Sequence, residues 1–222
     1  MTSSPASTHT NVTVCNHPLV KHNLSIIRDK NTPNELFRSA MSRIGWFVVQ
    51  EATADLPLAK TIVETPLCKT ETNVLAPDVP VIIAPILRAG LVLGEIALDL
   101  IPSASVYHIG LYRDEETLRP VTYYNKLPSS IDYSVARIFV LDPMLATGGS
   151  AIAAIDIIKK LGTKAENIRF ACTISAPEGI EALSKAHPGV KIYTAAVDER
   201  LNDKAYIVPG LGDAGDRSFG TV

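Results

Sequence analysis

From residue 80 onward the sequence repeats short apolar runs rich in β-branched residues, and this alternation most limits the fold. The runs are "PVIIAPI", "SVYHIGLY", "ARIFVLD", "NIRFACTIS" and "VKIYTAAVD". Segments with helical spacing lie between several of them: "LVLGEIALDL", "SAIAAIDIIKKLG" and "PEGIEALSKAH". Continuous apolar strands that alternate with helices are typical of a parallel sheet covered on both faces. The sequence therefore predicts an α/β fold with a central parallel sheet flanked by helices.

The segments before this alternation carry local signals of their own. In "TPNELFRSAMSRIGWFVVQEA" a helix is predicted, with Thr32 as N-cap, Pro33 as first helical residue and Glu35 completing a capping box. The segment "KTIVETPLCKTETNVLAPD" alternates apolar and polar residues around Pro66, which favours a hairpin or edge strands.

Composition limits the domain organisation and the classes of partner. Residues 1–16 are rich in Ser, Thr and Asn and are predicted to be a flexible tail, which leaves residues 17–222 as a single domain. A net charge of −2 without a dense basic block argues against nucleic acid and acidic membranes as partners. No run approaches the roughly 18 apolar residues of a membrane span. The three scattered cysteines indicate reduced thiols, and Cys172 is predicted to fill the core, so we expect a cytoplasmic protein.

The segment "FVLDPMLATGGSAIAAIDII" places a polar loop between a predicted strand and a predicted helix. Asp142 ends the strand, and in open parallel sheets ligands bind beyond the carboxyl ends of the strands. The helix that starts near Ser150 directs free N–H groups into the same space, which favours an anion. Gly148 and Gly149 let the backbone approach a ligand, and the Thr147 and Ser150 hydroxyls add donors.

This loop is interpreted as a binder of a phosphorylated sugar. A carboxylate beside a phosphate is unfavourable, so Asp142 suits vicinal sugar hydroxyls, which donate hydrogen bonds to it. The simpler alternative is a tight strand-to-helix turn with a cap. Neither a Walker loop nor a GxGxxG turn is present, because the glycines are not followed by Lys and lack that spacing.

The loop "VLDPMLATGGS" resembles the phosphoribosyl-pyrophosphate loop of the type I phosphoribosyltransferase family. Many members carry a second acid where this chain has Pro143. That departure and five further motifs resemble the uracil-specific branch of the family: "HPLVKHNLSIIRD", "EATADLP", "PILRAG", "YRDEETLRPVTYYNKLP" and "YIVPGLGDAGDRSFGT". The resemblance covers roughly residues 17–222.

The resemblance implies a fold with a small hood and a β-hairpin arm beside the sheet. It also implies conversion of uracil and 5-phospho-α-D-ribose 1-diphosphate to UMP and diphosphate in pyrimidine salvage. Mg²⁺ would enter with the substrate, with no metal site formed by side chains alone. The polar segment "RDEETLRPVTYYNKLP" would be a mobile arm over the reacting centre. At least a homodimer is expected.

The resemblance, together with position at strand ends, also predicts the site residues. Asp142, Arg88 and Arg113 are the predicted catalytic residues, because forked arginines beyond strand ends suit pyrophosphate oxygens. The phosphoribosyl-pyrophosphate site is predicted to comprise Arg88, Arg113, Asp142, Pro143, Met144, Leu145, Ala146, Thr147, Gly148, Gly149, Ser150 and Asp213. The uracil site is predicted to comprise Ile207, Gly212, Asp213 and Ala214, with main-chain groups near Gly210 and Gly212 at the base edge.

Some alternatives stay open at this point. A basic cluster of His17, Lys21, His22 and Arg28 suits GTP, an effector of some family members, or is simply a solvated helix face. An RNA-binding regulator with the same fold would need a basic face, which a chain of pI ≈ 6.2 does not advertise. A transferase for purines or orotate is the enzyme alternative, but orotate calls for a cation that "PGLGDAG" does not supply.

Overall fold

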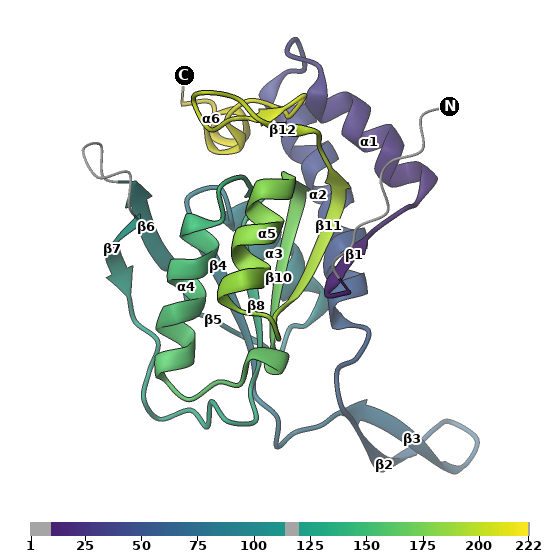
Figure 1. The fold of residues 1–222 in the computed structure, drawn as a ribbon. Coiled ribbons are helices and arrows are strands. Elements are labelled where there is room, and N and C mark those ends of the chain that lie inside the picture. Colours follow the sequence, from purple (N-terminus) through teal and green to yellow (C-terminus); the bar gives the residue numbers. More distant parts are fainter. Residues whose placement is uncertain (1–9, 114–119, 222) are drawn as a thin grey trace.

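A computed structural model describes residues 10–113 and 120–221 of the chain, and within them a nine-stranded central sheet dominates (Figure 1). The strand order is β1-β11-β10-β8-β4-β6-β7, with β5 beside β4 and β9 beside β10. The strands are β1 (Val12–Val14), β4 (Val81–Leu87), β5 (Ser105–Val106), β6 (Ile109–Arg113), β7 (Pro120–Asn125), β8 (Arg137–Leu141), β9 (Met144–Leu145), β10 (Ile168–Ser175) and β11 (Lys191–Val197). All pairs are parallel except β6–β7, so the predicted parallel sheet is confirmed.

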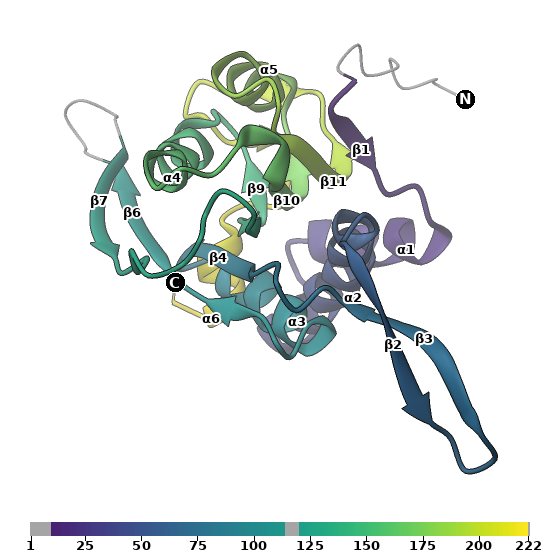
Figure 2. The same cartoon turned by 90° about the horizontal axis from the view of Figure 1, so that it is seen from below.

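Helices cover both faces of the sheet, as the alternation of strands and helices predicts (Figure 2). They are α1 (Pro18–Arg28), α2 (Asn34–Thr53), α3 (Leu91–Leu100), α4 (Gly149–Lys160), α5 (Pro177–Ala186) and α6 (Ala214–Phe219), with a short 3₁₀ turn at Ala165–Asn167. Helices α1 to α3 pack on one face and α4 and α5 on the other. Ile83 and Phe139 lie in the first core, whereas Ile82 and Ile138 lie in the second. Successive side chains of β4 and β8 therefore point alternately into the two cores.

Two local predictions near the N-terminus are wrong. Val12–Val14, which we assigned to a flexible tail, form β1 at the sheet edge beside β11. Helix α2 begins at Asn34 with Pro33 as N-cap, and no side chain caps it. The Thr32 hydroxyl, the predicted cap, instead donates to the carbonyl oxygen of Ile26 at 2.6 Å. The predicted capping box therefore does not form.

Two small antiparallel sheets stand apart from the central one. Strands β2 (Leu58–Glu64) and β3 (Lys69–Leu75) form a hairpin that extends away from the body, as "KTIVETPLCKTETNVLAPD" predicts (Figures 1 and 2). Strands β12 (Arg200–Leu201) and β13 (Ile207–Val208) pair with each other. Together with α6 they form a hood above the carboxyl ends of the central strands (Figure 1).

The remaining sequence predictions concern cysteines, membranes and the polar arm. Cys172 is fully buried, as predicted, and all three cysteines are free thiols. Among the described residues, no helix has both the length and the apolar character needed to cross a bilayer. The predicted arm begins at β6 and continues in β7, but residues 114–119 lie outside the described residues.

Candidate active site

The loop between β8 and α4 encloses a hollow of about 70 Å³ at the carboxyl ends of the strands. The short strand β9 lies within this loop and pairs with the end of β10. The residues that line the hollow are Asp142, Met144, Leu145, Ala146, Thr147, Gly148, Gly149, Ser150 and Ala151. Pro143 is buried, and its carbonyl oxygen accepts hydrogen bonds from the N–H groups of Thr173 and Ile174. The loop is thus one continuous lining, fastened to the sheet at Pro143.

Gly148 sets the shape of this loop where α4 begins. It is the N-cap of the helix and has φ +82°, a conformation that side-chain-bearing residues rarely adopt. A Cβ at Gly148 would lie 3.1 Å from the carbonyl oxygen of Gly179 in α5. A Cβ at Gly179 would in turn lie 2.4 Å from the carbonyl oxygen of Ala146. The loop therefore packs directly on the backbone of α5. Sequence reasoning missed Gly179, because a glycine inside "PEGIEALSKAH" carries no chemical signal.

Asp142 is the acid in the lining of this hollow. Its pKa is raised to about 7; burial is the largest cause, the N–H of Met144, 3.5 Å from Oδ1, lowers the pKa, and the carboxylate of Asp213 raises it. Asp142 forms no ion pair with any described residue. A buried acid without a cation is suited to accept hydrogen bonds from sugar hydroxyls or to face a developing positive charge.

The two predicted arginines lie at the same end of the sheet. Arg88 follows β4 directly, and its side chain is 57% exposed. Its Nη2 lies 3.3 Å from Oδ1 of Asp216 in α6, so the hood holds it beside the site. Arg113 is the last residue of β6, whose end points to the same side of the molecule (Figure 1). The side chain of Arg113 lies outside the described part of the chain.

A second hollow, of about 190 Å³, adjoins the first under the hood. Its lining combines two predicted base-site residues, Ile207 and Asp213, with five that sequence reasoning did not assign to the base: Met144, Ala146, Lys204, Ala205 and Tyr206. Tyr206 directly precedes Ile207 in "KAYIVPG", which is the signal that could have found it. Lys204 brings a cation to this hollow that the shorter segment "PGLGDAG" lacks.

Residues 207–213 are here called the base loop, and only some of their main-chain N–H and C=O groups are free to bind a base. The Gly210 N–H donates to Asp198 Oδ2 at 2.9 Å, and the Gly210 carbonyl accepts from Arg28 Nη1 at 2.8 Å. The N–H of Gly210 is therefore engaged within the protein, and its carbonyl already accepts one hydrogen bond. The Gly212 peptide, at φ +80°, makes no hydrogen bond with another described residue. Ala214 is buried and begins α6, and Asp213 caps that helix by accepting the Asp216 N–H at 2.9 Å.

Comparison with known proteins shows the family to which the chain belongs. The sequence profile of the family described as "Uracil phosphoribosyltransferase" matches residues 14–221. A uracil phosphoribosyltransferase of Dictyoglomus turgidum is 57% identical over 210 residues, which are 95% of this chain and 99% of the relative. That of Lactococcus lactis subsp. lactis is 54% identical over 208 residues, which are 94% of this chain and 97% of the relative. This chain belongs to the uracil phosphoribosyltransferase family.

Solved structures agree with this family assignment. The structure titled "AQ2163 protein from Aquifex aeolicus" superposes with a TM-score of 0.86 at 38% identity, covering 94% of this chain and 97% of that one. An adenine phosphoribosyltransferase from Giardia lamblia, solved with 9-deazaadenine, superposes with a TM-score of 0.50 at 17% identity. The match covers 73% of this chain and 81% of that one, and it supports the fold alone. The predicted type I phosphoribosyltransferase fold is therefore confirmed.

The basic cluster predicted for an effector of the family does not form one free patch. His17 caps α1 by accepting the Leu19 N–H at 3.1 Å, and its ring stacks on Phe47. Arg28 is bound to Asp198 with distances of 2.5 and 2.9 Å. His17, Lys21 and His22 are all exposed, and Arg28 is the member of this cluster that is bound in an ion pair.

Proposed function

We propose that this chain transfers the phosphoribosyl group of 5-phospho-α-D-ribose 1-diphosphate to uracil, giving UMP and diphosphate. One observation carries the proposal: Met144 and Ala146 line both hollows. The loop before α4 and the hollow lined by Tyr206 and Ile207 therefore share a wall, as a sugar phosphate and a flat base require if they are to react. The names of the relatives support uracil as the base.

Positioning and electrostatics would supply most of the catalysis. As the bond to diphosphate breaks, the sugar carbon becomes positively charged and the leaving group gains negative charge. The loop before α4 would bind the 5′-phosphate through main-chain N–H groups at the helix start. Asp142 would accept hydrogen bonds from the ribose hydroxyls and face the developing cation. Arg88 would bind the diphosphate in competition with Asp216.

The described residues fit a Mg²⁺ ion that enters with the substrate. No group of three or more His, Cys, Asp or Glu side chains among them is arranged to hold a metal, so substrate oxygens would supply most ligands. Asp142 and Asp213 interact with each other, and a cation near them would relieve the repulsion that raises the pKa of Asp142. Bound in this way, Mg²⁺ would neutralise charge on the departing diphosphate.

A panel of nucleobases tests the proposal. Protein, 5-phospho-α-D-ribose 1-diphosphate and Mg²⁺ are mixed with uracil, cytosine, orotate, adenine, hypoxanthine or guanine, and nucleotide formation is followed by chromatography. UMP alone is the expected product. Orotate turnover exceeding that of uracil would reassign the enzyme, and the Lys204→Gln variant would then show whether this cation holds the orotate carboxylate.

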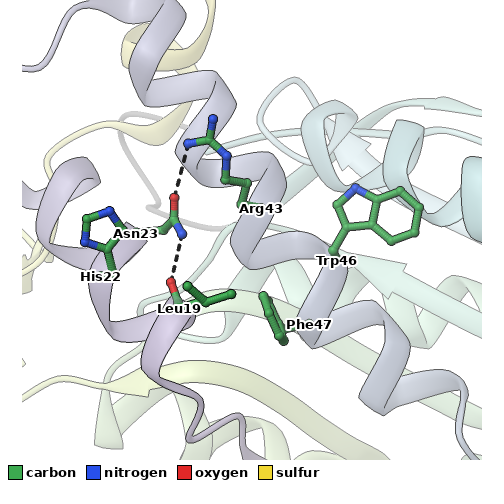
Figure 3. Close-up of a pocket in the computed structure, with 6 residues that line it drawn as sticks. All are labelled: Leu19, His22, Asn23, Arg43, Trp46 and Phe47. Atoms are coloured by element: carbon green, nitrogen blue, oxygen red, sulfur yellow. Dashed lines mark hydrogen bonds between the residues drawn. The ribbon is translucent and has the colours of Figure 1, made fainter.

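We further infer a homodimer or a larger homo-oligomer, because the chain exposes two apolar surfaces that a second copy could cover. The hairpin β2–β3 leaves Leu67 94% and Ile62 72% exposed, and an isolated hairpin of two strands is marginally stable. Between α1 and α2 lies a hollow of about 390 Å³ with Trp46 at its rim, lined by Leu19, His22, Asn23, Arg43, Trp46 and Phe47 (Figure 3).

Mass in solution tests this arrangement. The wild-type chain should elute at two or more times 23.9 kDa. An Ile62→Glu variant should shift toward the monomer, because a charge on the hairpin cannot enter an apolar interface. A monomeric wild type would refute the proposal.

GTP regulation and a cytoplasmic location remain predictions. Exposed Lys21 and His22 give GTP less support than the sequence suggested, because Arg28 is engaged elsewhere. Activity measured with and without GTP decides the first prediction. Cell fractionation decides the second.

A further inference from the structure

An ion pair between a partly exposed arginine and a buried aspartate fastens the base loop to the body of the protein. Asp198 follows β11, its side chain is only 3% exposed, and its N–H donates to the Ser175 carbonyl at the end of β10. Arg28, the last residue of α1, binds both carboxylate oxygens of Asp198, at 2.5 and 2.9 Å. A forked pair of this kind fixes the relative orientation of both side chains.

The pair holds the base loop at Gly210, through both polar groups of its main chain. Asp198 Oδ2 accepts the Gly210 N–H, and Arg28 Nη1 donates to the Gly210 carbonyl. Gly210 has φ +62°, and a Cβ there would lie 2.1 Å from the Ile207 carbonyl oxygen, so the turn is tight. Anchoring Gly210 therefore also places Ile207, which lines the base hollow, and Gly212, two residues further on.

A second arginine holds the other side of the loop against the same end of α1. Arg217 in α6 donates to the Leu211 carbonyl at 2.6 Å, and also to the carbonyls of Ile27 and Asp29 on either side of Arg28. Its guanidinium lies 4.3 Å from the centre of the Phe37 ring. Arg28 reaches from α1 to the loop, and Arg217 reaches from the hood to α1.

We propose that Arg28, Asp198 and Arg217, here called the base-loop clamp, are positioning residues that set the affinity of the enzyme for the nucleobase. The inference rests on the proposed function of the base hollow. None of the three lines either hollow, so they act through the loop rather than on the substrate. The clamp also explains why Arg28 is absent from any free basic patch.

Kinetics of the Arg28→Lys and Asp198→Asn variants test the clamp. Lysine keeps the charge but cannot fork onto the carboxylate while reaching Gly210, and asparagine removes the charge while its amide oxygen can still accept from Gly210. Both variants should raise KM for uracil and, in the reverse reaction, for UMP by about ten- to a hundredfold. KM for 5-phospho-α-D-ribose 1-diphosphate and for diphosphate should stay within about twofold.

A different arginine–aspartate pair, remote from the base loop, provides the control. Arg169, near the start of β10, binds Asp55 with distances of 2.6 and 3.1 Å, at the opposite end of the sheet. Arg169→Lys and Asp55→Asn should lower the melting temperature without changing KM for uracil. If the clamp variants behave like these controls, or raise KM for both substrates equally, the clamp has no positioning role and the proposal fails.

A measurement without substrate separates the clamp from the proposed function. In the ligand-free protein, hydrogen exchange at the Gly210 amide should be faster in both clamp variants and unchanged in the two controls. Unchanged exchange in the clamp variants would refute the clamp even where the wild type makes UMP. A wild type that makes no UMP would refute the proposed function. The hydrogen exchange of the Gly210 amide would then still decide whether the clamp holds the base loop.

Discussion

The guanidinium of Arg88 is paired with the carboxylate of Asp216, 3.3 Å from Nη2 to Oδ1. The arginine that we assign to diphosphate is therefore held by an acid of the hood. The pair is largely exposed, so its net stabilisation is only about 0–1 kcal/mol and a diphosphate can displace it.

Arg88→Gln should weaken the binding of 5-phospho-α-D-ribose 1-diphosphate and of diphosphate. A charge-assisted contact contributes about 1.5–3 kcal/mol, which is roughly ten- to a hundredfold in Kd. UMP lacks the diphosphate, so its Kd should change far less. Titration calorimetry with the three ligands measures this. Equal losses for UMP and diphosphate would move Arg88 to the 5′-phosphate or to folding.

The matched variant Asp216→Asn releases Arg88 without removing it. Because the lost pair is weak, the Kd for diphosphate should fall by no more than about fivefold. Asp216 also accepts a hydrogen bond from the Thr221 hydroxyl, which asparagine can keep. Weaker diphosphate binding in Asp216→Asn would show that Asp216 orients Arg88 rather than competing with the ligand.

Gly148→Val should abolish binding of 5-phospho-α-D-ribose 1-diphosphate. A β-branched residue resists φ +82°, and its Cβ would lie 3.1 Å from the Gly179 carbonyl oxygen, so the amides at the start of α4 must move. Gly162→Val is the control, because Gly162 also has positive φ, at +99°, but a Cβ there meets nothing within 4 Å. Both variants should lose stability, and only the first should lose affinity. Unchanged affinity in Gly148→Val would refute the phosphate-loop assignment.

Asp142→Asn should stabilise the ligand-free protein at pH 8 while slowing turnover. The pKa of Asp142 is raised from 3.8 to about 7, so folding disfavours the charged form. The contribution of Asp142 to the free energy of unfolding is therefore fully present below about pH 4 and is lost as the pH rises through about 7. Each pKa unit corresponds to about 1.4 kcal/mol. Thermal unfolding at several pH values should therefore show a gain in Tm that appears above pH 4 and grows up to pH 8.

Asp132→Asn serves as the control, because the pKa of Asp132 is lowered by folding whereas that of Asp142 is raised. Hydrogen bonds from the Ser134 hydroxyl and N–H lower the pKa of this exposed carboxyl, so its stabilisation exists at high pH and is lost in acid. Asparagine at 132 should therefore never stabilise the protein at pH 8. If Asp142→Asn lowered Tm at pH 8, the buried carboxylate would have a partner that offsets its burial.

The strands and the phosphate loop could be predicted from sequence because their signals are local. The apolar, β-branched composition of a run such as "ARIFVLD" predicts a buried strand. Asp142, Gly148 and the start of the helix are close together in the chain, so one short motif predicts the loop. The capping box at Thr32 does not form because the Thr32 hydroxyl donates instead to the Ile26 carbonyl, six residues earlier at the end of α1. Local propensity loses to such a contact when the two energies are similar.

The base site could be predicted only in part, because its parts are distant in sequence. Arg28 and Gly210 are separated by 182 positions and Arg28 and Asp198 by 170, and no spacing rule links them. Two glycines in "PGLGDAG" looked equally able to present main-chain groups to a base. Only the fold shows that the groups of Gly210 are occupied by the ion pair while those of Gly212 are not.

This difference sharpens the account of how uracil is told from cytosine. Uracil offers a carbonyl acceptor and a ring N–H donor where cytosine offers an amino donor and a bare ring acceptor, so both positions are reversed. Fixed main-chain groups beside Gly212 can reject cytosine without a charged side chain. Two mismatched buried groups cost about 1–3 kcal/mol each, so cytosine turnover should be lower by several orders of magnitude. 5-Fluorouracil should be accepted, since its recognition edge is unchanged.

Asp213→Asn tests whether the main chain or the side chain reads the base. Asp213 lines the base hollow, but its Oδ1 accepts the Asp216 N–H at the start of α6, and asparagine can keep that cap. The variant should therefore fold and lose activity, because a charge near the sugar is gone, while the ratio of kcat/KM for uracil to that for cytosine stays as in the wild type. Gly212→Ala is its counterpart: at φ +80° the new methyl group strains the backbone, so KM for uracil should rise. Cytosine turnover by Asp213→Asn would show that the carboxylate, and not the peptide at Gly212, reads the base.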